Sequence, residues 1–491
     1  TLRCRPNAPG PSRCSIASDA LIEGPEPASR SHCPSAIRLM ARPASYSKES
    51  ASRMHTLEQL ERGELTGIRR LDLSADLQHF PEAIFALADT LEVLNLSGNR
   101  LNSLPPDLSR LRKLRILFCS DNLFTEVPGC LGDCEQLEMI GFKANQIRHL
   151  PGAALPPALR WLILTDNQLQ ALPDEIGNCR RLQKLMLAGN QLSSLPDSLA
   201  NCVNLELLRI AANRLPALPD WLLTLPRLSW LAAAGNPFSD ASEAMSLARH
   251  SLPGIPREQV VLHEQLGQGA SGIIYRAAWQ PSGQSPKQMA AKLFKGHVTS
   301  DGLPHSEMAA CVSAGAHPNL IDVAGPLADQ PGQTPGLLMD LVEPAFQPLA
   351  GPPSLVSCTR DCYAEDRTFT VEQALRIARG TASAVAHLHQ RGILHGDLYA
   401  HNLLVDPTGE CLLSDFGAAS FFEPDSATGQ ALQRIESRAF GCLLEELLQR
   451  CPDLENDSHR HTLFELQNQC MSEQPEGRPN FSQLHTTLAA L

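Results

Sequence analysis

The sequence predicts a multi-domain chain in which an α/β solenoid precedes a separate α+β domain. Its 491 residues are too many for one hydrophobic core, so two or three domains are expected. A leucine and asparagine pattern recurs between residues 68 and 238, which is typical of stacked structural repeats. After residue 255 the repeats stop, and a glycine-rich turn, a lysine and two aspartates follow at spacings that suit phosphate chemistry.

Residues 1–53 are rich in Ser, Pro, Ala and Arg and show no hydrophobic periodicity. Such a segment buries too little apolar surface to offset its ordering entropy, so we expect it to be disordered. Because the chain starts at Thr1 and an amphipathic segment starts at Met54, we interpret Met54 as the natural start and residues 1–53 as a non-native extension. The Arg and Ser bias also resembles an organelle transit peptide, which is the alternative.

Seven copies of the pattern Leu-x-x-Leu-x-Leu-x-x-Asn run through residues 91–236. The two leucines of Leu-x-Leu lie on one face of a short strand, and the asparagine can bond backbone groups left open where the chain turns. No repeat buries its leucines alone, so stacking of the repeats creates the core. The asparagines, 22 or 23 residues apart, are Asn99, Asn122, Asn145, Asn167, Asn190, Asn213 and Asn236.

This pattern resembles that of the leucine-rich repeat family. The resemblance implies a solenoid of about eight repeats in residues 54–240, with a capping helix at about 54–64 and a first, degenerate repeat from Ile68 to Asp76. Residues 241–255, which include Pro253-Gly254, are expected to form a linker. Residues 256–491 form the second predicted domain.

The variable strand positions of such a solenoid face its concave side, and here they carry an apolar row. Large exposed apolar patches with aromatic residues tend to be partner surfaces. We therefore expect the row to bind a protein partner or the chain's own second domain. Its six residues are Ile116, Phe118, Met139, Trp161, Ile163 and Met186.

The charge of the chain is uneven, with a net −12 and 15 Lys+Arg against 27 Asp+Glu in residues 256–491. An acidic second half argues against nucleic acid as the main partner, because binding a phosphate backbone needs basic surface. No apolar run approaches the ~18 residues of a membrane helix, so no membrane partner is expected. The 15 cysteines lack the paired spacing of a zinc site, and we interpret them as thiols of a cytoplasmic protein.

A glycine-rich turn opens the second domain. Glycines at the Gly-x-Gly-x-x-Gly spacing let backbone N–H groups approach phosphates, although the motif alone also fits a dinucleotide site. Lys292 follows Gly272 by twenty residues, and Glu307 lies fifteen further on, in a helical stretch where it could pair with the lysine. The named residues of the turn are Leu266, Gly267, Gly269, Gly272 and Ile274.

The most informative stretch is His395-Gly396-Asp397-Leu398-Tyr399-Ala400-His401-Asn402, which Asp415-Phe416-Gly417 follows. Phosphoryl transfer from ATP needs one carboxylate to take or orient the substrate hydroxyl proton, and further oxygen ligands to hold Mg²⁺. With the glycine-rich turn and the lysine, these motifs resemble those of the protein kinase family. The resemblance spans nearly all of residues 256–491 and implies a bilobal protein-kinase-like fold that uses ATP and Mg²⁺.

The resemblance also assigns roles by position. It implies that Asp397 is the catalytic base, that Asn402 and Asp415 are Mg²⁺ ligands, and that Lys292 with Glu307 orients the ATP phosphates. It further implies a gatekeeper, two backbone contacts to adenine and three apolar residues around the ring. These are Met339 as gatekeeper, Asp340 and Val342 as backbone contacts, and Ile274, Ala290 and Leu404 around the ring.

The sequence departs from the kinase pattern at several positions. Gly396 stands where the family usually has the Arg that reads a phosphorylated activation loop. Tyr399 and His401 replace cations found in Ser/Thr and Tyr kinases, so a cation near the γ-phosphate is missing or supplied by His401. The segment from Gly417 to Glu436 is only about 18 residues and lacks Ala-Pro-Glu, so Arg478 lacks its usual glutamate partner.

We therefore expect a protein kinase that phosphorylates Ser/Thr more than Tyr hydroxyls of proteins, with repeats for partner binding or regulation. One alternative is a pseudokinase scaffold whose repeats carry the function. Another is a small-molecule phosphotransferase, because His-Gly-Asp with a downstream Asn is also the loop of antibiotic phosphotransferases. Asp415-Phe416-Gly417, His317-Pro318-Asn319 and Arg478-Pro479 argue against the small-molecule enzyme.

Overall fold

The computed structural model describes residues 54–491 except residues 270, 296–297, 329–331 and 333. The expectations of disorder or a non-native extension for residues 1–53 lie outside the described residues. All described residues fall in one compact unit of the chain, so contacts between the repeats and residues 256–491, here called the C-terminal domain, are contacts within one body.

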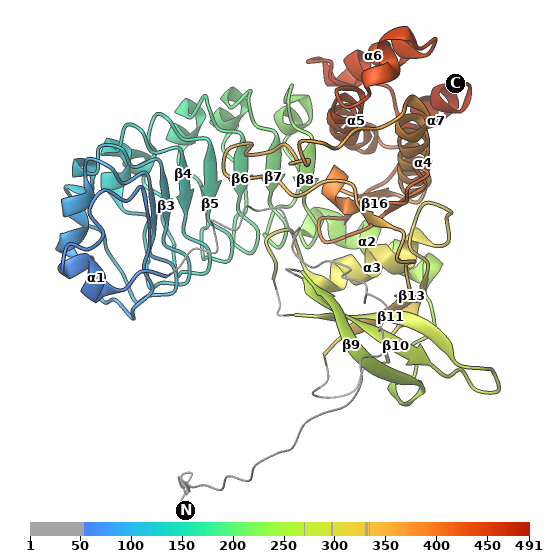
Figure 1. Cartoon of the computed structure of the whole chain (residues 1–491), viewed down its shortest axis with the longest axis horizontal. Coiled ribbons are helices and arrows are strands. Elements are labelled where there is room, and N and C mark those ends of the chain that lie inside the picture. The colour runs from blue at the N-terminus through green and yellow to red at the C-terminus, as the bar shows by residue number, and fades with distance from the viewer. Residues whose placement is uncertain (1–53, 270, 296–297, 329–331, 333) are drawn as a thin grey trace, which may run out of the picture. The chain divides into compact units, whose positions relative to one another are not determined.

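Eight parallel strands build one continuous sheet in the first half of the chain (Figure 1). Neighbouring strands pair in register one repeat apart, so that Leu94 lies opposite Leu117. A short helix α1 (Leu57–Glu61), capped by the side chain of Thr56, precedes the sheet. The predicted solenoid is thus confirmed. Its strands are β1 (Arg70–Asp72), β2 (Val93–Asn95), β3 (Ile116–Phe118), β4 (Met139–Gly141), β5 (Trp161–Ile163), β6 (Lys184–Met186), β7 (Leu207–Arg209) and β8 (Trp230–Ala232).

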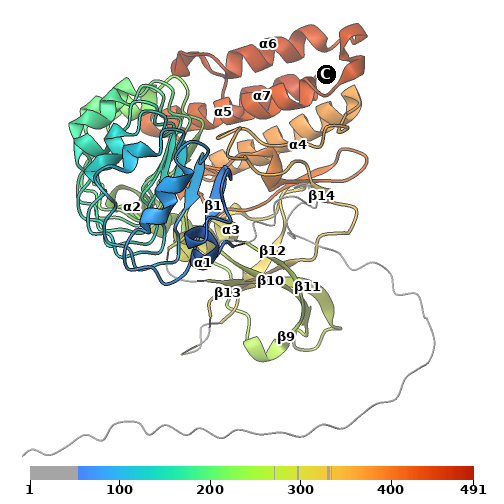
Figure 2. The same ribbon diagram turned by 60° about the vertical axis from the view of Figure 1, so that its left-hand side comes forward.

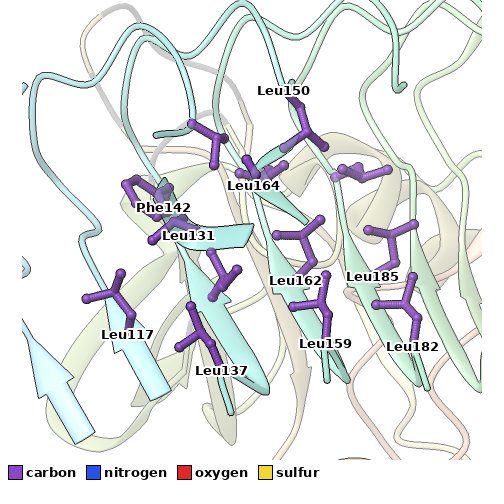
Figure 3. Close-up of a cluster of buried hydrophobic side chains, with 14 of the residues drawn as sticks. Leu117, Leu131, Leu137, Phe142, Leu150, Leu159, Leu162, Leu164, Leu182 and Leu185 are labelled. Carbon is purple, nitrogen blue, oxygen red and sulfur yellow. The ribbon is translucent and has the colours of Figure 1, made fainter. Parts of the chain in front are cut away.

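The core of the solenoid consists of leucine rows that run from repeat to repeat. Leu162 and Leu185 lie at the centres of adjacent strands, and Leu159 and Leu182 form the row beside them (Figure 3). All four are 0% exposed. Burying one such side chain stabilises the fold by about 1.5–3 kcal/mol, so stability is spread over all repeats.

The repeated asparagines are hydrogen-bonded to the backbone of adjacent repeats. Asn190 illustrates the pattern: its Nδ2 donates to the carbonyl oxygens of Leu164 (2.8 Å) and Leu187 (2.9 Å). Its Oδ1 accepts the N–H of Leu169 (3.0 Å). The prediction that asparagine satisfies open backbone groups at the turn is therefore confirmed.

We expect Asn190→Ala to lower the free energy of unfolding of the repeats by about 1–3 kcal/mol, because the buried Leu169 N–H loses its acceptor. The carbonyls of Leu164 and Leu187 keep hydrogen bonds from the asparagines of the neighbouring repeats. Urea unfolding of the full chain, followed by circular dichroism, measures the loss. The exposed Asn102, changed to Ala, is the matched control and should unfold like the wild type. Equal losses in the two variants would contradict a specific role for the asparagine row.

The apolar row on the concave face is less exposed than the sequence suggested. Ile116 is 8% exposed and Met139 2%, while the other four residues are half-buried. The row is therefore only partly exposed, and its expected binding to a protein partner or to the chain's own second domain stays a prediction. Trp161 Nε1 lies 3.4 Å from Met186 Sδ, and Met186 also packs against a buried cluster that Leu207 and Trp230 of the repeats share with the C-terminal domain.

Helix α2 (Pro237–His250) joins the solenoid to the C-terminal domain and covers much of the predicted linker. It begins after Asn236, the last repeat asparagine, and Pro237 occupies its first turn. The helix packs against α3 (Pro304–Ala314), where the carboxylate of Glu243 accepts a hydrogen bond from Ser306 Oγ at 3.1 Å. The end of the solenoid is therefore attached to the first helix of the next domain.

The first lobe of the C-terminal domain is an antiparallel five-stranded sheet with α3 beside it (Figure 1). The strand order is β12-β13-β11-β10-β9, so β11 lies at the centre of the sheet. The strands are β9 (Val260–Gln268), β10 (Gly272–Trp279), β11 (Lys287–Phe294), β12 (Val323–Pro326) and β13 (Gly336–Asp340).

The second lobe is mainly helical, and four of its helices lie side by side (Figure 2). They are α4 (Val371–Gln390), α5 (Ala427–Leu448), α6 (Arg460–Cys470) and α7 (Phe481–Ala489). Short strands hold the loops that carry the acidic motifs. These are β14 (Gln347–Pro348), β15 (Ile393–Leu394), β16 (Leu403–Val405), β17 (Cys411–Leu413) and β18 (Ser420–Phe421).

Candidate active site

Lys292 on β11 is paired with Glu307 on α3. The central position of β11 places Lys292 between Ile274 of β10 and Leu337 of β13. Lys292 Nζ donates to Glu307 Oε1, and the Glu307 side chain is 2% exposed. Burial alone would lower the pKa of Lys292, but Glu307 and Asp415 hold that pKa above its ordinary value. The structure thus brings the two predicted residues together with the lysine charged.

The glycine-rich turn connects β9 to β10 above this pair. A side chain at Gly269 would meet nothing within 4 Å, which leaves room at the turn. At Gly272 a Cβ atom would lie 2.6 Å from the Leu293 carbonyl oxygen, so only glycine lets β10 approach β11 there. Leu266 is buried below the turn, and Gly267 pairs with Ile274 in the sheet.

The predicted adenine-side residues come from both lobes. Ala290 of β11 lies opposite Met339 of β13, and Ala290 is 5% exposed. Leu404, buried on β16, belongs to the other lobe. The Asp340 N–H donates to the Asp322 carbonyl at 2.8 Å, so this N–H is already engaged. Ile274 is half-buried on β10, and Val342 follows β13 as a buried residue.

Asp397 lies in the loop of residues 395–402, called the catalytic loop below, between β15 and β16. Asn402 Nδ2 donates to both the backbone oxygen and Oδ2 of Asp397, each at 2.9 Å. The Asp397 side chain is 17% exposed, so it is not fully covered. Burial would raise its pKa, but Arg209, His401 and His395 hold the pKa of Asp397 below its usual range. The carboxylate is therefore ionised and held in one orientation.

Glu436 of α5 is hydrogen-bonded to the backbone of the catalytic loop. The motifs of the sequence assign no role to this residue. Its carboxylate accepts the Gly396 N–H at 2.7 Å and the His395 N–H at 3.3 Å. It also pairs with His389 of α4 at 2.7 Å. Burial would raise the pKa of Glu436, but these partners hold it below its ordinary value. No signal in the sequence indicated this role, because α5 carries other charged residues, among them Arg434 and Glu445.

Asn402 and Asp415 are suited to bind Mg²⁺. The Asn402 amide nitrogen is used on Asp397, which leaves its amide oxygen to act as a ligand. Asp415 is exposed, and its backbone is linked to Asn402 through Ser414, whose N–H donates to the Asn402 carbonyl at 2.9 Å. Two protein oxygens match the preference of Mg²⁺, which otherwise keeps water and phosphate ligands. The residues present thus fit the predicted cation.

Comparison with known families agrees with this geometry. The model of the protein kinase domain matches residues 260–440, and the model of the leucine-rich repeat matches residues 89–147 and 157–215. The chain carries leucine-rich repeats and a protein kinase domain. Both resemblances inferred from the motifs are therefore confirmed.

Relatives match parts of the chain only. A probable serine/threonine-protein kinase of Dictyostelium discoideum (gdt4) is 30% identical over 165 residues, which are 33% of this chain and 9% of that protein. Human ephrin type-B receptor 4 is 28% identical over 191 residues, 39% of this chain and 18% of the receptor. A mouse leucine-rich repeat and calponin homology domain-containing protein is 33% identical over 119 residues, 23% of this chain and 17% of that protein. The chain thus spans less than a fifth of these relatives.

Among solved structures, a leucine-rich repeat protein of Leptospira interrogans is 29% identical, with a TM-score of 0.31. The match covers 37% of this chain and 52% of that protein. In the part of the chain that the structure describes, no helix is both long and apolar enough to cross a membrane.

The backbone conformation and the close neighbours of Gly396 explain why glycine occupies this position of the catalytic loop. The residue has φ +74°, a conformation that favours glycine. A Cβ atom there would lie 2.5 Å from the carbonyl oxygen of Leu231 in β8 and 2.6 Å from that of Ala418. Gly396 therefore allows the last repeat strand to lie against the catalytic loop.

His401 and Tyr399, the two other residues of the loop that depart from the kinase pattern, each contact a neighbouring side chain. His401 Nδ1 lies 2.7 Å from Asp361 Oδ1, and this carboxylate holds the pKa of His401 above its ordinary value although burial lowers it. Tyr399 stacks on Trp230 of β8 with ring centroids 4.2 Å apart. The option that His401 supplies a free cation to the γ-phosphate is not favoured by this geometry, since its ring is engaged with Asp361.

The repeats contribute several residues to the active site that sequence reasoning missed. Arg209 of β7 donates to Asp301 Oδ1 at 2.9 Å, to the Gly396 carbonyl at 3.0 Å and to Asp397 Oδ1. Trp230 Nε1 donates to the Leu398 carbonyl at 2.9 Å. The available signal in the sequence was a charged residue, Arg209, at a concave strand position. Its partner Asp397 lies 188 residues away, so the sequence did not indicate the pair.

The repeats also provide partners for two arginines of the kinase domain. Arg478, predicted to lack its usual glutamate partner, donates from Nη2 to the Pro226 carbonyl at 2.6 Å. Arg438 of α5 donates to Ser229 Oγ at 2.6 Å. The turn before β8 thus fills a position that the short segment 417–436 does not reach.

Proposed function

We propose that this protein is an ATP- and Mg²⁺-dependent protein kinase that transfers the γ-phosphoryl group to Ser or Thr hydroxyls of proteins. One observation carries the proposal. The Lys292–Glu307 pair, the Asp397–Asn402 pair and the Asp415 carboxylate are all assembled in one kinase domain.

In this proposal each residue acts through charge and position. Lys292 holds the phosphates, and Glu307 fixes the lysine. Asp397 accepts or orients the proton of the substrate hydroxyl, while Asn402 holds that carboxylate in place. Mg²⁺, held by Asn402 and Asp415, would neutralise phosphate charge when bound. Positioning and electrostatic stabilisation are the main sources of rate in such a transfer.

Two observations support serine and threonine as acceptors. The loop position four after Asp397, where tyrosine kinases often carry Arg, holds His401, and that side chain is engaged with Asp361. The relative from Dictyostelium discoideum is named a probable serine/threonine-protein kinase. We infer the same acceptor class for this chain.

The test is a transfer assay with radiolabelled ATP, Mg²⁺ and generic protein substrates, followed by phosphoamino-acid analysis. We expect label on serine and threonine. Lys292→Met should remove it, because the phosphates lose their cation. Lys287→Met, an exposed lysine on the same strand, is the matched control and should keep full activity.

Each other outcome contradicts a defined part of the proposal. Label on tyrosine alone would contradict the acceptor class. Nucleotide binding in a thermal melt without transfer would indicate a pseudokinase. Transfer to a small molecule but to no protein would indicate a small-molecule phosphotransferase.

We also propose that the repeats bind a protein partner through the strands that lie away from the kinase domain. Phe118, Trp161 and Ile163 are half-buried on β3 and β5, whereas β7 and β8 contact the catalytic loop. We infer that a protein partner would bind the β3–β5 part of the concave face.

A further inference from the structure

Arg209 is a buried arginine whose three hydrogen-bonding nitrogens all bond to the kinase domain. Its side chain is 2% exposed although it belongs to a repeat strand. Nε bonds Asp301, Nη1 bonds the Gly396 carbonyl, and Nη2 bonds Asp397. A guanidinium group is buried only where acids and carbonyls replace water. Both of its ion-pair partners lie in the kinase domain, so the domain interface is what makes its burial possible.

The catalytic loop contains no lysine or arginine of its own. Residues 395–402 read His-Gly-Asp-Leu-Tyr-Ala-His-Asn, and both histidine rings have other partners. His395 Nε2 lies 3.0 Å from the Ser414 carbonyl, and His401 Nδ1 lies 2.7 Å from Asp361. The permanent positive charge in contact with Asp397 therefore comes from the seventh repeat strand.

We propose that Arg209 is a positioning residue for phosphotransfer, so that the leucine-rich repeats complete the catalytic loop of the kinase domain. This inference rests on the proposed function. Asp397 is held from two sides, with Asn402 on Oδ2 and Arg209 on Oδ1. The planar guanidinium fixes the rotation of the carboxylate, which a flexible ammonium group would do less well.

Arg209 also links the catalytic loop to the ATP-binding lobe. Asp301, which accepts from Arg209 Nε, lies three residues before the start of α3. Helix α3 carries Glu307, the partner of Lys292. One guanidinium therefore joins the loop that positions the substrate hydroxyl to the helix that positions the phosphates.

The opposite interpretation is that the repeats block the active site. Two contacts and the exposure of Asp397 argue against it. Lys292 and Glu307 are paired in the same structure in which the repeats contact the loop. Helix α2 of the repeats supports α3 through Glu243 and Ser306. The Asp397 side chain is 17% exposed. A blocking domain is expected to separate these groups or to cover Asp397 fully.

The decisive experiment compares Arg209→Ala with Arg209→Lys in the full-length chain. We expect Arg209→Ala to reduce kcat about 100-fold, the size of effect that follows loss of one preorganised charge contact. The KM for ATP should stay close to the wild-type value, because Lys292 and Glu307 are not altered. Arg209→Lys should recover part of the loss, and so should millimolar guanidinium added to Arg209→Ala.

Controls separate this role from a merely structural one. Arg214→Ala removes an exposed arginine from the next turn of the same solenoid and should leave kcat unchanged. Thermal melts and elution volumes identify variants that have lost the fold. A rise in kcat in Arg209→Ala would overturn the proposal and indicate inhibition by the repeats. Unchanged kcat, or a loss that neither lysine nor guanidinium restores, would also overturn it. If wild-type protein transfers no phosphate, the proposed function fails instead.

Discussion

Asp397→Asn is expected to lower kcat for phosphotransfer by about 10³-fold, within the range for loss of a general acid–base group. The amide keeps the shape of the side chain but can no longer accept a proton. The carboxylate is ionised in the wild type, since Arg209, His401 and His395 lower its pKa despite burial. Steady-state transfer rates at saturating ATP and Mg²⁺ measure the effect.

The matched control for this variant is Asp366→Asn, which changes an exposed aspartate of the same domain. Its kcat should equal that of the wild type. Thermal melts with and without nucleotide should show that Asp397→Asn still folds and binds ATP. Activity within a few-fold of the wild type in Asp397→Asn would remove Asp397 from the proposed role.

Gly396→Ala is expected to have the second largest effect. A side chain at φ +74° is strained by about 1–2 kcal/mol. The larger consequence is steric, because the new Cβ would lie 2.5 Å from the Leu231 carbonyl and 2.6 Å from the Ala418 carbonyl. The last repeat strand must then move from the catalytic loop, and Arg209 moves with it. We expect a loss of kcat at least as large as that in Arg209→Ala.

Gly283→Ala provides a closely matched control. Gly283 lies in the same domain at the same φ of +74°, yet a Cβ there would meet nothing within 4 Å. It should share the backbone strain and keep full activity. If both variants lose activity equally, strain in the glycine conformation, rather than contact with the repeats, would explain the loss.

The solenoid could be predicted almost completely from the sequence. Leu162 is buried in the core and Asn190 bonds the backbone of the adjacent repeat. Both positions recur along the repeats, so the local period of the sequence predicts their environment. The pairs Lys292–Glu307 and Asp397–Asn402 could be predicted because each lies on elements adjacent in the chain. Both pairs are separated by at most 15 residues in the sequence.

The contribution of the repeats to the active site could not be predicted in this way. Arg209 stands at a variable concave position, where any residue type keeps the repeat pattern. The pairing with Asp397 depends on how two separately folded parts dock, which no local period encodes. For the same reason Gly396 could be interpreted from sequence only as the absence of the arginine that reads a phosphorylated activation loop, whereas the structure shows a steric fit to Leu231.

The separation of 188 residues between Arg209 and Asp397 has a consequence for biosynthesis. Domains generally fold in order as the chain emerges from the ribosome, at about 5–20 residues per second. The solenoid is therefore complete before the catalytic loop has been made. Since the loop receives its arginine only after docking, a nascent or prematurely terminated chain lacks a finished active site. The contact between Arg209 and Asp397 thus forms only when both the repeats and the catalytic loop have been synthesised and folded.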